Sequence, residues 1–216
     1  MNREPLVIEY LTDGPRRGYT YTSPTAAYAE STLKEIWRYA MPRGQGWGDE
    51  SMAGARSIKC FPLEDGRAAL ADVAVTDQAD EHGRRGIRRA QIEVLSARDW
   101  APHVQARLDA YPDVVRSAAA ERLGFCRRTD IIAKTLPRFR RDPRLVLLHP
   151  YTGPRRWQIM EAFVLMLALE PVGLMRRWGT MIPFNTLALD YREECRMVAL
   201  PNNHAARVDI PSVTLP

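Results

Sequence analysis

The sequence of 216 residues is 45% apolar and carries a formal net charge of +5. A chain of this length and apolar content can bury a sizeable core, which argues against intrinsic disorder. Its three cysteines are widely spaced and form no CxxC pair, so they argue against a secreted disulfide scaffold and predict reduced thiols in the cytoplasm. The positive charge favours an acidic partner, such as nucleic acid or an acidic protein face.

Neither the start of the chain nor its most apolar stretch predicts contact with a membrane. Residues 1–10 lack the basic region, apolar core and cleavage site of a secretory signal and predict a first strand instead. Residues 157–169 are apolar almost all round, but this stretch of 13 residues is shorter than the roughly 20 that a membrane span needs. We therefore expect a buried core helix, no membrane insertion and a cytoplasmic location.

The first elements predicted are a strand pair and a helix. Residues 6–11 and 17–22 should pair around the turn-forming Asp13-Gly14-Pro15. Ser23 is the expected N-cap of the helix that follows, with Pro24 at its first position. The helix should end at Pro42. Five apolar residues share one of its faces: Ala29, Leu33, Ile36, Trp37 and Ala40.

A hairpin and a further strand come next. After a glycine-rich loop at 43–55, residues 57–63 and 67–75 should form the hairpin across Asp65-Gly66. A charged loop at 77–86 follows. In the next strand three apolar residues alternate with three polar ones, which is typical of a strand with one buried face and one wet face. The apolar set is Ala90, Ile92 and Val94, and the polar set is Arg89, Gln91 and Glu93.

Two helices and a basic connector complete the first half. Trp100, Val104, Leu108 and Tyr111 share one helical stripe, and a second helix at 114–123 should end at Gly124. Residues 126–144 are the most basic window of the chain and the best candidate for a linker.

The second half opens with a short buried strand at 145–148 and leads through a turn into the apolar helix at 157–169. A short helix at 174–178 and a closing hairpin of 181–189 with 195–200 follow, and the tail beyond Pro201 should be irregular. The predicted fold is therefore α+β, with mixed sheets and flanking helices in two packed subdomains. These are residues 1–125 and 145–216, joined by the basic connector at 126–144.

No motif in the sequence indicates catalysis, a cofactor-binding site or a metal site. The turn Tyr151-Thr152-Gly153-Pro154 lacks the glycine spacing and Lys-Ser/Thr pair of a phosphate loop, and the four histidines lack metal-ligand spacing. Asp77, Asp80, Glu81 and His82 are the densest set of hard-metal ligands, but they do not follow the pattern of a calcium loop. A hydrolase built on a cysteine or on this acidic loop is the third-ranked hypothesis.

Two arginine clusters are the candidate binding residues. They could contact nucleic-acid phosphates, or form a solvated rim that meets an acidic protein, and both interpretations are open at this point. The aromatic content near them is low for a single-strand binder, which usually stacks bases on several aromatic rings. The first cluster is Arg84, Arg85, Arg88 and Arg89, and the second is Arg138, Arg140, Arg141 and Arg144 with Phe139 among them.

Two stretches carry a family resemblance. The first contains Tyr21-Thr22-Ser23-Pro24 opening a helix, the hairpin IKCFPLEDGRAALADVAVT and the turn into RRAQIEVL. The second contains the apolar helix, Leu174-Met175-Arg176-Arg177-Trp178, and strands with Pro183-Phe184-Asn185-Thr186 and Arg196-Met197-Val198-Ala199-Leu200. In these patterns the chain resembles the amino-terminal region of bacterial GTPase-associated proteins, found beside small GTPases in predicted conflict or signalling systems.

The resemblance implies a fold and an operon context, since none of these patterns contains a catalytic residue. Two departures stand out: Ile87-Arg88-Arg89-Ala90-Gln91 replaces the family's usual aromatic and histidine residues, and the family's longer downstream regions are missing. The expected function is a non-catalytic adaptor or scaffold that docks onto a small GTPase or an effector, without binding GTP itself. The runner-up is a nucleic-acid-binding subunit of an antiviral complex.

Overall fold

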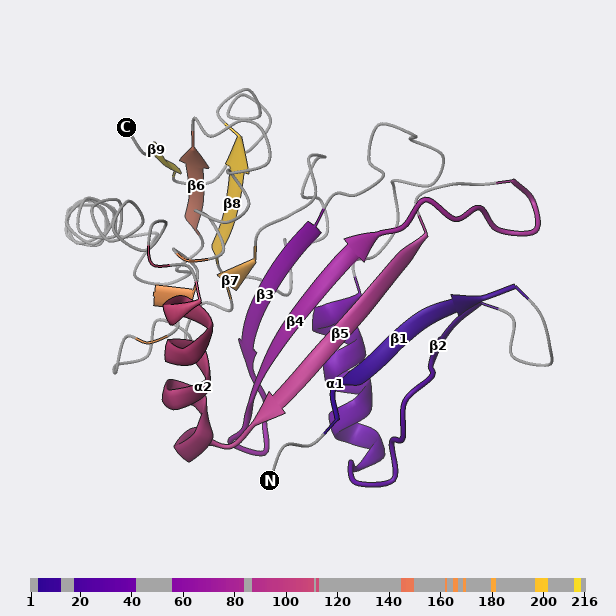
Figure 1. Cartoon of the computed structure of the whole chain (residues 1–216), viewed down its shortest axis with the longest axis horizontal. Helices are drawn as coiled ribbons and strands as arrows, with labels where there is room; N and C mark the ends of the chain where they lie inside the picture. Colours follow the sequence, from indigo (N-terminus) through magenta and orange to yellow (C-terminus); the bar gives the residue numbers. More distant parts are fainter. Residues whose placement is uncertain are drawn as a thin grey trace.

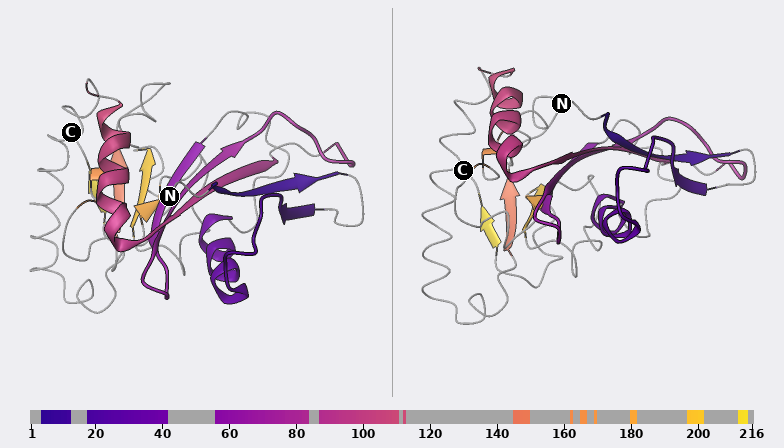
Figure 2. Two further views of the ribbon diagram at one scale, coloured as in Figure 1. Left: turned by 60° about the horizontal axis from the view of Figure 1, so that its bottom comes forward. Right: turned by 90° about the horizontal axis from the view of Figure 1, so that it is seen from below.

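The computed structural model describes residues 4–12, 18–41, 56–83 and 87–110, together with short segments and single residues at 112, 145–149, 162, 165–166, 169, 180–181, 197–201 and 212–214. Within these ranges the strands form one mixed sheet in the order β2-β1-β5-β4-β3-β7-β8-β6-β9. Helix α1 covers one face of the sheet and helix α2 packs on the other (Figures 1 and 2). The predicted α+β class, with a sheet and flanking helices, is confirmed.

Strands β1 (Leu6–Leu11) and β2 (Gly18–Tyr21) pair antiparallel, as predicted. Leu6 and Ile8 are fully buried, whereas the residues between and after them are partly exposed. This alternation sets the orientation of β1, because successive side chains of a strand point to opposite faces. One face of β1 therefore belongs to the core beneath α1.

Helix α1 (Glu30–Ala40) begins later than the sequence predicts. Ala29, not Ser23, precedes its first residue. The Ser23 hydroxyl instead accepts a hydrogen bond of 2.8 Å from the backbone N–H of Val7, so it is used to hold the loop against β1. Four of the five expected stripe residues face the core: Ile36 and Ala40 are buried, and Leu33 and Trp37 pack against them. Ala29 lies outside the helix and is exposed, so it does not belong to the stripe. The helix also ends before Pro42, as expected.

The predicted hairpin consists of β3 (Arg56–Pro62) and β4 (Ala68–Val75). Its loop is closed by hydrogen bonds from the Leu63 N–H to the Arg67 carbonyl and from the Gly66 N–H to the Leu63 carbonyl, at 2.9 and 3.1 Å. Gly66 has φ of +83°, which completes a three-residue hairpin loop that needs a left-handed residue at this position. The Asp65-Gly66 signal in the sequence was therefore correct.

Strand β5 (Arg88–Leu95) lies between β1 and β4 and is antiparallel to both. Ala90 and Ile92 are buried while Arg89 and Gln91 are exposed, which confirms the predicted alternation. Helix α2 (Ala97–Asp109) follows directly and buries Trp100, Val104 and Leu108, as its stripe predicts. The second predicted helix of the first half, at 114–123, lies outside the described residues.

Helix α2 begins with a reciprocal cap. The Ser96 hydroxyl donates to Oδ2 of Asp99 at 2.6 Å and accepts from the Asp99 N–H at 3.2 Å. A serine cap with an acidic residue three positions later satisfies one of the unpaired N–H groups at a helix start. This cap fixes where α2 leaves the end of β5.

The second half adds four strands to the same sheet: β6 (Leu145–His149), β7 (Thr180–Met181), β8 (Met197–Pro201) and β9 (Ser212–Thr214). The strand predicted at 145–148 is thus confirmed. The link to the first half is β7, which pairs antiparallel with β3 and places Thr180 opposite Cys60. The proposed boundary at 126–144 lies outside the described residues, so the division into two subdomains stays a prediction.

Two predictions for the second half are wrong. In the described part of the expected closing hairpin, β7 runs parallel to β8, with Thr180 opposite Met197, so these two strands are not hairpin partners. A parallel pair needs a crossover rather than a tight turn, and the connection at 182–196 is long enough for one. The tail is also not irregular throughout, since β9 pairs parallel with β6. Apolar alternation reveals a strand but not its direction, which explains the first error.

Part of the predicted apolar helix at 157–169 is described: Ala162, Leu165 and Met166 are helical and buried. The loop around Trp47 and the short helix predicted at 174–178 lie outside the described residues. Among the described helices, none has the length and apolar character needed to cross a membrane.

Lys59 joins the sheet to the end of α1. Its side chain is only 3% exposed, and its Nζ donates to the carbonyls of Ala40 and Tyr39 at 2.9 and 3.3 Å. The last carbonyls of a helix lack partners within the helix and carry partial negative charge, so a buried ammonium group is stabilised there. Lys59 therefore holds the carboxyl end of α1 on β3.

We predict that Lys59→Met lowers the free energy of unfolding by about 2–3 kcal/mol, because two buried carbonyls lose a charged donor. Urea denaturation at neutral pH measures this change. Lys34→Met is the control, since Lys34 lies on the exposed face of α1 with its side chain 75% accessible and, among the described residues, pairs with Glu30 alone. Equal effects of the two substitutions would contradict the role of Lys59.

We also predict a loss of stability at alkaline pH through Tyr21. Its hydroxyl donates to the Leu33 carbonyl at 2.8 Å, and burial raises the pKa of this hydroxyl far above its usual value of about 10. Above about pH 10 the unfolded chain releases the Tyr21 proton while the folded chain keeps it, so the free energy of unfolding falls. Tyr21→Phe should make this fall less steep in urea denaturation between pH 9 and 11, and an unchanged slope would contradict the prediction.

Candidate interaction surfaces

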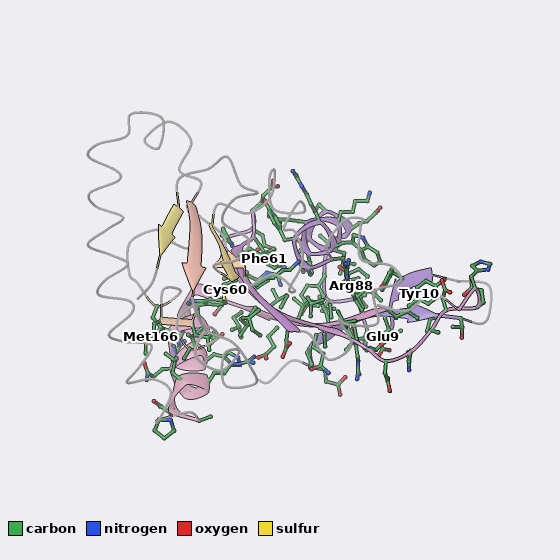
Figure 3. The ribbon with its side chains drawn as sticks, turned by 90° about the horizontal axis from the view of Figure 1, so that it is seen from above. Glu9, Tyr10, Cys60, Phe61, Arg88 and Met166 are labelled. Atoms are coloured by element: carbon green, nitrogen blue, oxygen red, sulfur yellow. The ribbon has the colours of Figure 1, made fainter. Side chains whose placement is uncertain are left out.

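Arg88 and Arg89, which the sequence placed in one cluster, lie on opposite faces of β5. Arg88 is 7% exposed and lies on the α1 side, as its label in Figure 3 shows, whereas the Arg89 side chain is 50% exposed on the other face. Adjacent strand residues must diverge in this way. The expected common surface is therefore corrected: Arg88 belongs to the interior. The other six predicted arginines, Arg84, Arg85, Arg138, Arg140, Arg141 and Arg144, lie outside the described residues.

Arg88 is built into an aromatic corner. Its backbone N–H donates to the Tyr19 hydroxyl oxygen at 2.9 Å, and the Tyr19 ring meets the edge of Tyr10 at a centroid distance of 5.3 Å. Burial raises the pKa of the Tyr19 hydroxyl, while the backbone hydrogen bond and the nearby charge of Arg88 act in the opposite direction. The position of Arg88 is thus structural.

Arg89 belongs to a polar sheet surface that we call the open face. Its Nε lies 2.6 Å from Oε1 of Glu9, and Oε2 of Glu9 accepts a hydrogen bond of 2.9 Å from the Thr22 hydroxyl. No described helix covers this part of β1, β2 and β5 (Figure 2). The open face consists of Val7, Glu9, Leu11, Thr20, Ala74, Arg89 and Gln91, all at least partly exposed.

The open face suits a protein partner better than a nucleic acid. Glu9 already neutralises the guanidinium of Arg89, so a phosphate would have to compete with a carboxylate for it. The aromatic residues of the same strands, Tyr10, Tyr19 and Tyr21, lie on the α1 side, so the open face offers no stacking ring among its described residues. Mixed, paired charges are typical of the polar rim of a protein interface.

Two of the residues considered for hydrolysis, Asp80 and Cys60, have structural roles. Oδ1 of Asp80 accepts from the His82 N–H and its carbonyl accepts from the Gly83 N–H, both at 2.9 Å, so Asp80 organises a turn. Cys60 is fully buried, and the other two cysteines lie outside the described residues. The described part of the chain also gathers no group of three His, Cys, Asp or Glu residues that could hold a metal.

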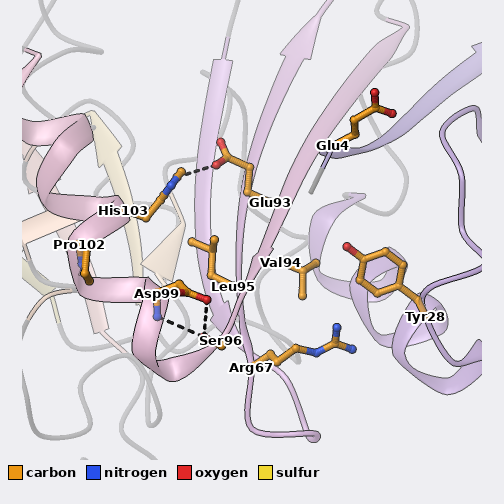
Figure 4. Close-up of a pocket in the computed structure, with 10 residues that line it drawn as sticks. All are labelled: Glu4, Tyr28, Arg67, Glu93, Val94, Leu95, Ser96, Asp99, Pro102 and His103. Atoms are coloured by element: carbon orange, nitrogen blue, oxygen red, sulfur yellow. Dashed lines mark hydrogen bonds and ion pairs between the residues drawn. The ribbon is translucent and has the colours of Figure 1, made fainter. Parts of the chain in front are cut away.

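A cleft that the sequence did not predict lies where β5 passes into α2 (Figure 4). Its volume is about 550 Å³. The end of β5 forms its floor, the first turns of α2 form one wall, and Tyr28 with Arg67 forms the other. The lining residues are Glu4, Tyr28, Arg67, Glu93, Val94, Leu95, Ser96, Asp99, Pro102 and His103.

Glu93 connects the cleft floor to α2. One carboxylate oxygen lies 2.5 Å from Nε2 of His103, and the other accepts from Nη1 of Arg107 at 3.1 Å. His103 and Arg107 are four residues apart, so they lie on one side of the helix. The sequence shows this spacing, but only the tertiary structure reveals that Glu93 faces both groups.

The opposite wall is equally ordered. Asp65 accepts from Nε and Nη2 of Arg67 at 3.0 and 2.6 Å, and these hydrogen bonds hold the pKa of the Asp65 carboxyl below its usual value. The guanidinium carbon of Arg67 lies 5.2 Å from the centre of the Tyr28 ring, within the range of a cation–π contact. Arg67 and Tyr28 therefore form a preformed wall.

Comparison with known proteins finds no relative: no family model, no curated protein and no solved structure matches the chain.

We predict that Glu93→Gln lowers the free energy of unfolding by about 1–2 kcal/mol, because it weakens the contacts of one carboxylate with two groups of α2. Glu9→Gln is the matched control: Glu9 is equally exposed, at 33%, but its partner Arg89 is half in solvent, so we expect a loss below about 1 kcal/mol. Urea denaturation measures both. Equal losses would show that Glu93 does not hold α2 on the sheet.

Proposed function

We propose that the chain is a non-catalytic adaptor or scaffold subunit of a bacterial GTPase-associated or defence assembly, and that it acts by protein–protein interaction. The observation that carries this proposal is the open face, where Arg89 is exposed and already paired with Glu9. Such a surface can dock a partner through its polar rim without burying an unpaired charge. The family resemblance adds the assembly context, in which the partner is a small GTPase or an effector.

The proposal assigns no nucleotide chemistry to this chain. The sequence holds no phosphate loop, and of the residues considered for hydrolysis Cys60 is buried and Asp80 organises a turn. GTP therefore belongs to the partner in this proposal. Micromolar binding of labelled GTP by the purified chain alone would contradict it.

The second candidate is a nucleic-acid-binding subunit of an antiviral complex. The net charge of +5 and the arginine clusters favour it. Of the two described arginines in these clusters, however, Arg88 is buried and Arg89 is neutralised, so the contribution of the clusters depends on their six arginines outside the described residues. Binding to RNA and DNA at increasing salt separates the candidates, because affinity through phosphate contacts falls steeply with salt.

We predict that Arg89→Glu abolishes co-purification of the partner from the native host while the chain stays folded. The double variant Glu9→Arg with Arg89→Glu restores an ion pair in reversed orientation, so it should recover stability but not partner binding. Arg98→Glu, the same charge change at an exposed position of α2, should retain the partner. Retention of the partner by Arg89→Glu would show that the open face is not the docking surface.

A further inference from the structure

The floor of the cleft contains main-chain groups that none of the described strands uses. Both backbone groups of Val7 face β2, since its N–H donates to Ser23 and its carbonyl accepts from the Thr22 N–H at 2.9 Å. Neighbouring residues of an antiparallel strand direct their backbone N–H and carbonyl groups to opposite sides. The N–H and carbonyl of Leu6 therefore point toward β5. Leu6 is opposite Ile92, and this is the last registered pair between the two strands.

Val94 lies two residues beyond Ile92, so its N–H and carbonyl point to the same side of β5 as those of Ile92, the side on which β1 lies. The other neighbour of β5 leads to the same result. The Ile87 carbonyl accepts from the Thr76 N–H at 2.7 Å. Residues of β5 at an even separation from Ile87 therefore direct their backbone N–H and carbonyl toward β4. Val94 is at an odd separation, so its backbone groups point away from β4. Within the described residues no backbone hydrogen bond reaches these two groups of Val94. They offer one donor and one acceptor to an added strand.

The charges around this position are unbalanced. Arg67 is paired with Asp65, and Arg107 is paired with Glu93. Glu4 and Asp99 have no cationic partner among the described residues, so the cleft and its immediate partners carry an excess of negative charge on a chain whose net charge is positive. Figure 4 shows the two carboxylates on either side of the β5 floor. A positively charged side chain would complement either one.

We propose that this cleft binds an extended segment of a partner protein that carries a lysine or an arginine. The segment pairs with Val94 as a short added strand, and its basic side chains face Glu4 at one side of the cleft or Asp99 at the other. Main-chain pairing supplies affinity and the charged walls supply selectivity, as in other cases of strand addition. This inference takes from the proposed function only that the partner is a protein. It does not depend on the open face, because the cleft is a different surface.

The experiment is selection of a random peptide library, displayed on phage, against the purified full chain. We expect enriched peptides to carry lysine or arginine and to bind about tenfold more weakly to Glu4→Lys, in which an attraction becomes a repulsion. Glu4 has no described partner, so this variant keeps the fold. Asp77→Lys makes the same charge change at an exposed loop beyond the opposite end of β4 and should bind normally.

Amide hydrogen exchange tests the main-chain part of the proposal. The Val94 amide should exchange at least about tenfold more slowly when an enriched peptide is bound, whereas that of Ile92, already facing β1, should change little. The proposal is overturned if no peptide is enriched, if Glu4→Lys binds as tightly as the parent chain, or if exchange at Val94 is unaffected.

The same variants separate this inference from the adaptor function. If the native partner is lost with Arg89→Glu but retained with Glu4→Lys and with an enriched peptide in excess, the adaptor function stands and the cleft proposal fails. If peptides bind as expected but no partner co-purifies, the adaptor function fails and the cleft proposal stands.

Discussion

Strand β5 is the constraint on which every candidate surface depends. It is paired on both sides, with β1 and with β4, so its side chains have no freedom to exchange faces. Arg88 is thereby committed to the interior, Arg89 to the open face and Glu93 to the contact with α2. A shift of one residue in its register would bury Arg89 and expose Ile92.

The charged groups of the described regions are arranged mainly in pairs across elements. Arg89 meets Glu9 on the neighbouring strand, Arg107 meets Glu93 beneath α2, and Lys59 meets the carbonyls at the end of α1. Pairing of this kind costs little when partly exposed and is required when buried. It also means that the net positive charge of the chain is not evident on the open face.

The fixed orientation of the β5 side chains and the pairing of charges together support the proposed role as an interaction protein. A rigid antiparallel sheet presents a fixed pattern of polar side chains on the open face, and the end of the same sheet leaves the main chain of Val94 available beside a charged wall. Neither surface requires a moving part or a reactive group. Their different positions on β5 would allow one partner to contact both, or two partners to bind at once.

Local patterns in the sequence predicted the first half of the fold well. The alternation in β5, the Asp65-Gly66 hairpin and the stripe of α2 are short-range signals that depend on side-chain periodicity and on a left-handed glycine. Ser23 failed as a predicted cap because its hydroxyl bonds a strand sixteen residues earlier in the chain. A contact at that separation leaves no trace in the local sequence.

The sequence by itself determines which side chains can be buried and where strands and helices begin to form, because periodicity is a local property. Only the tertiary structure decides the parallel pairing of β7 with β8, the separation of Arg88 from Arg89 and the meeting of Glu93 with His103 and Arg107. Each of these depends on strand direction or on residues from different elements. The cleft is the clearest case, because its lining comes from both ends of the described first half and exists only once β5 is paired.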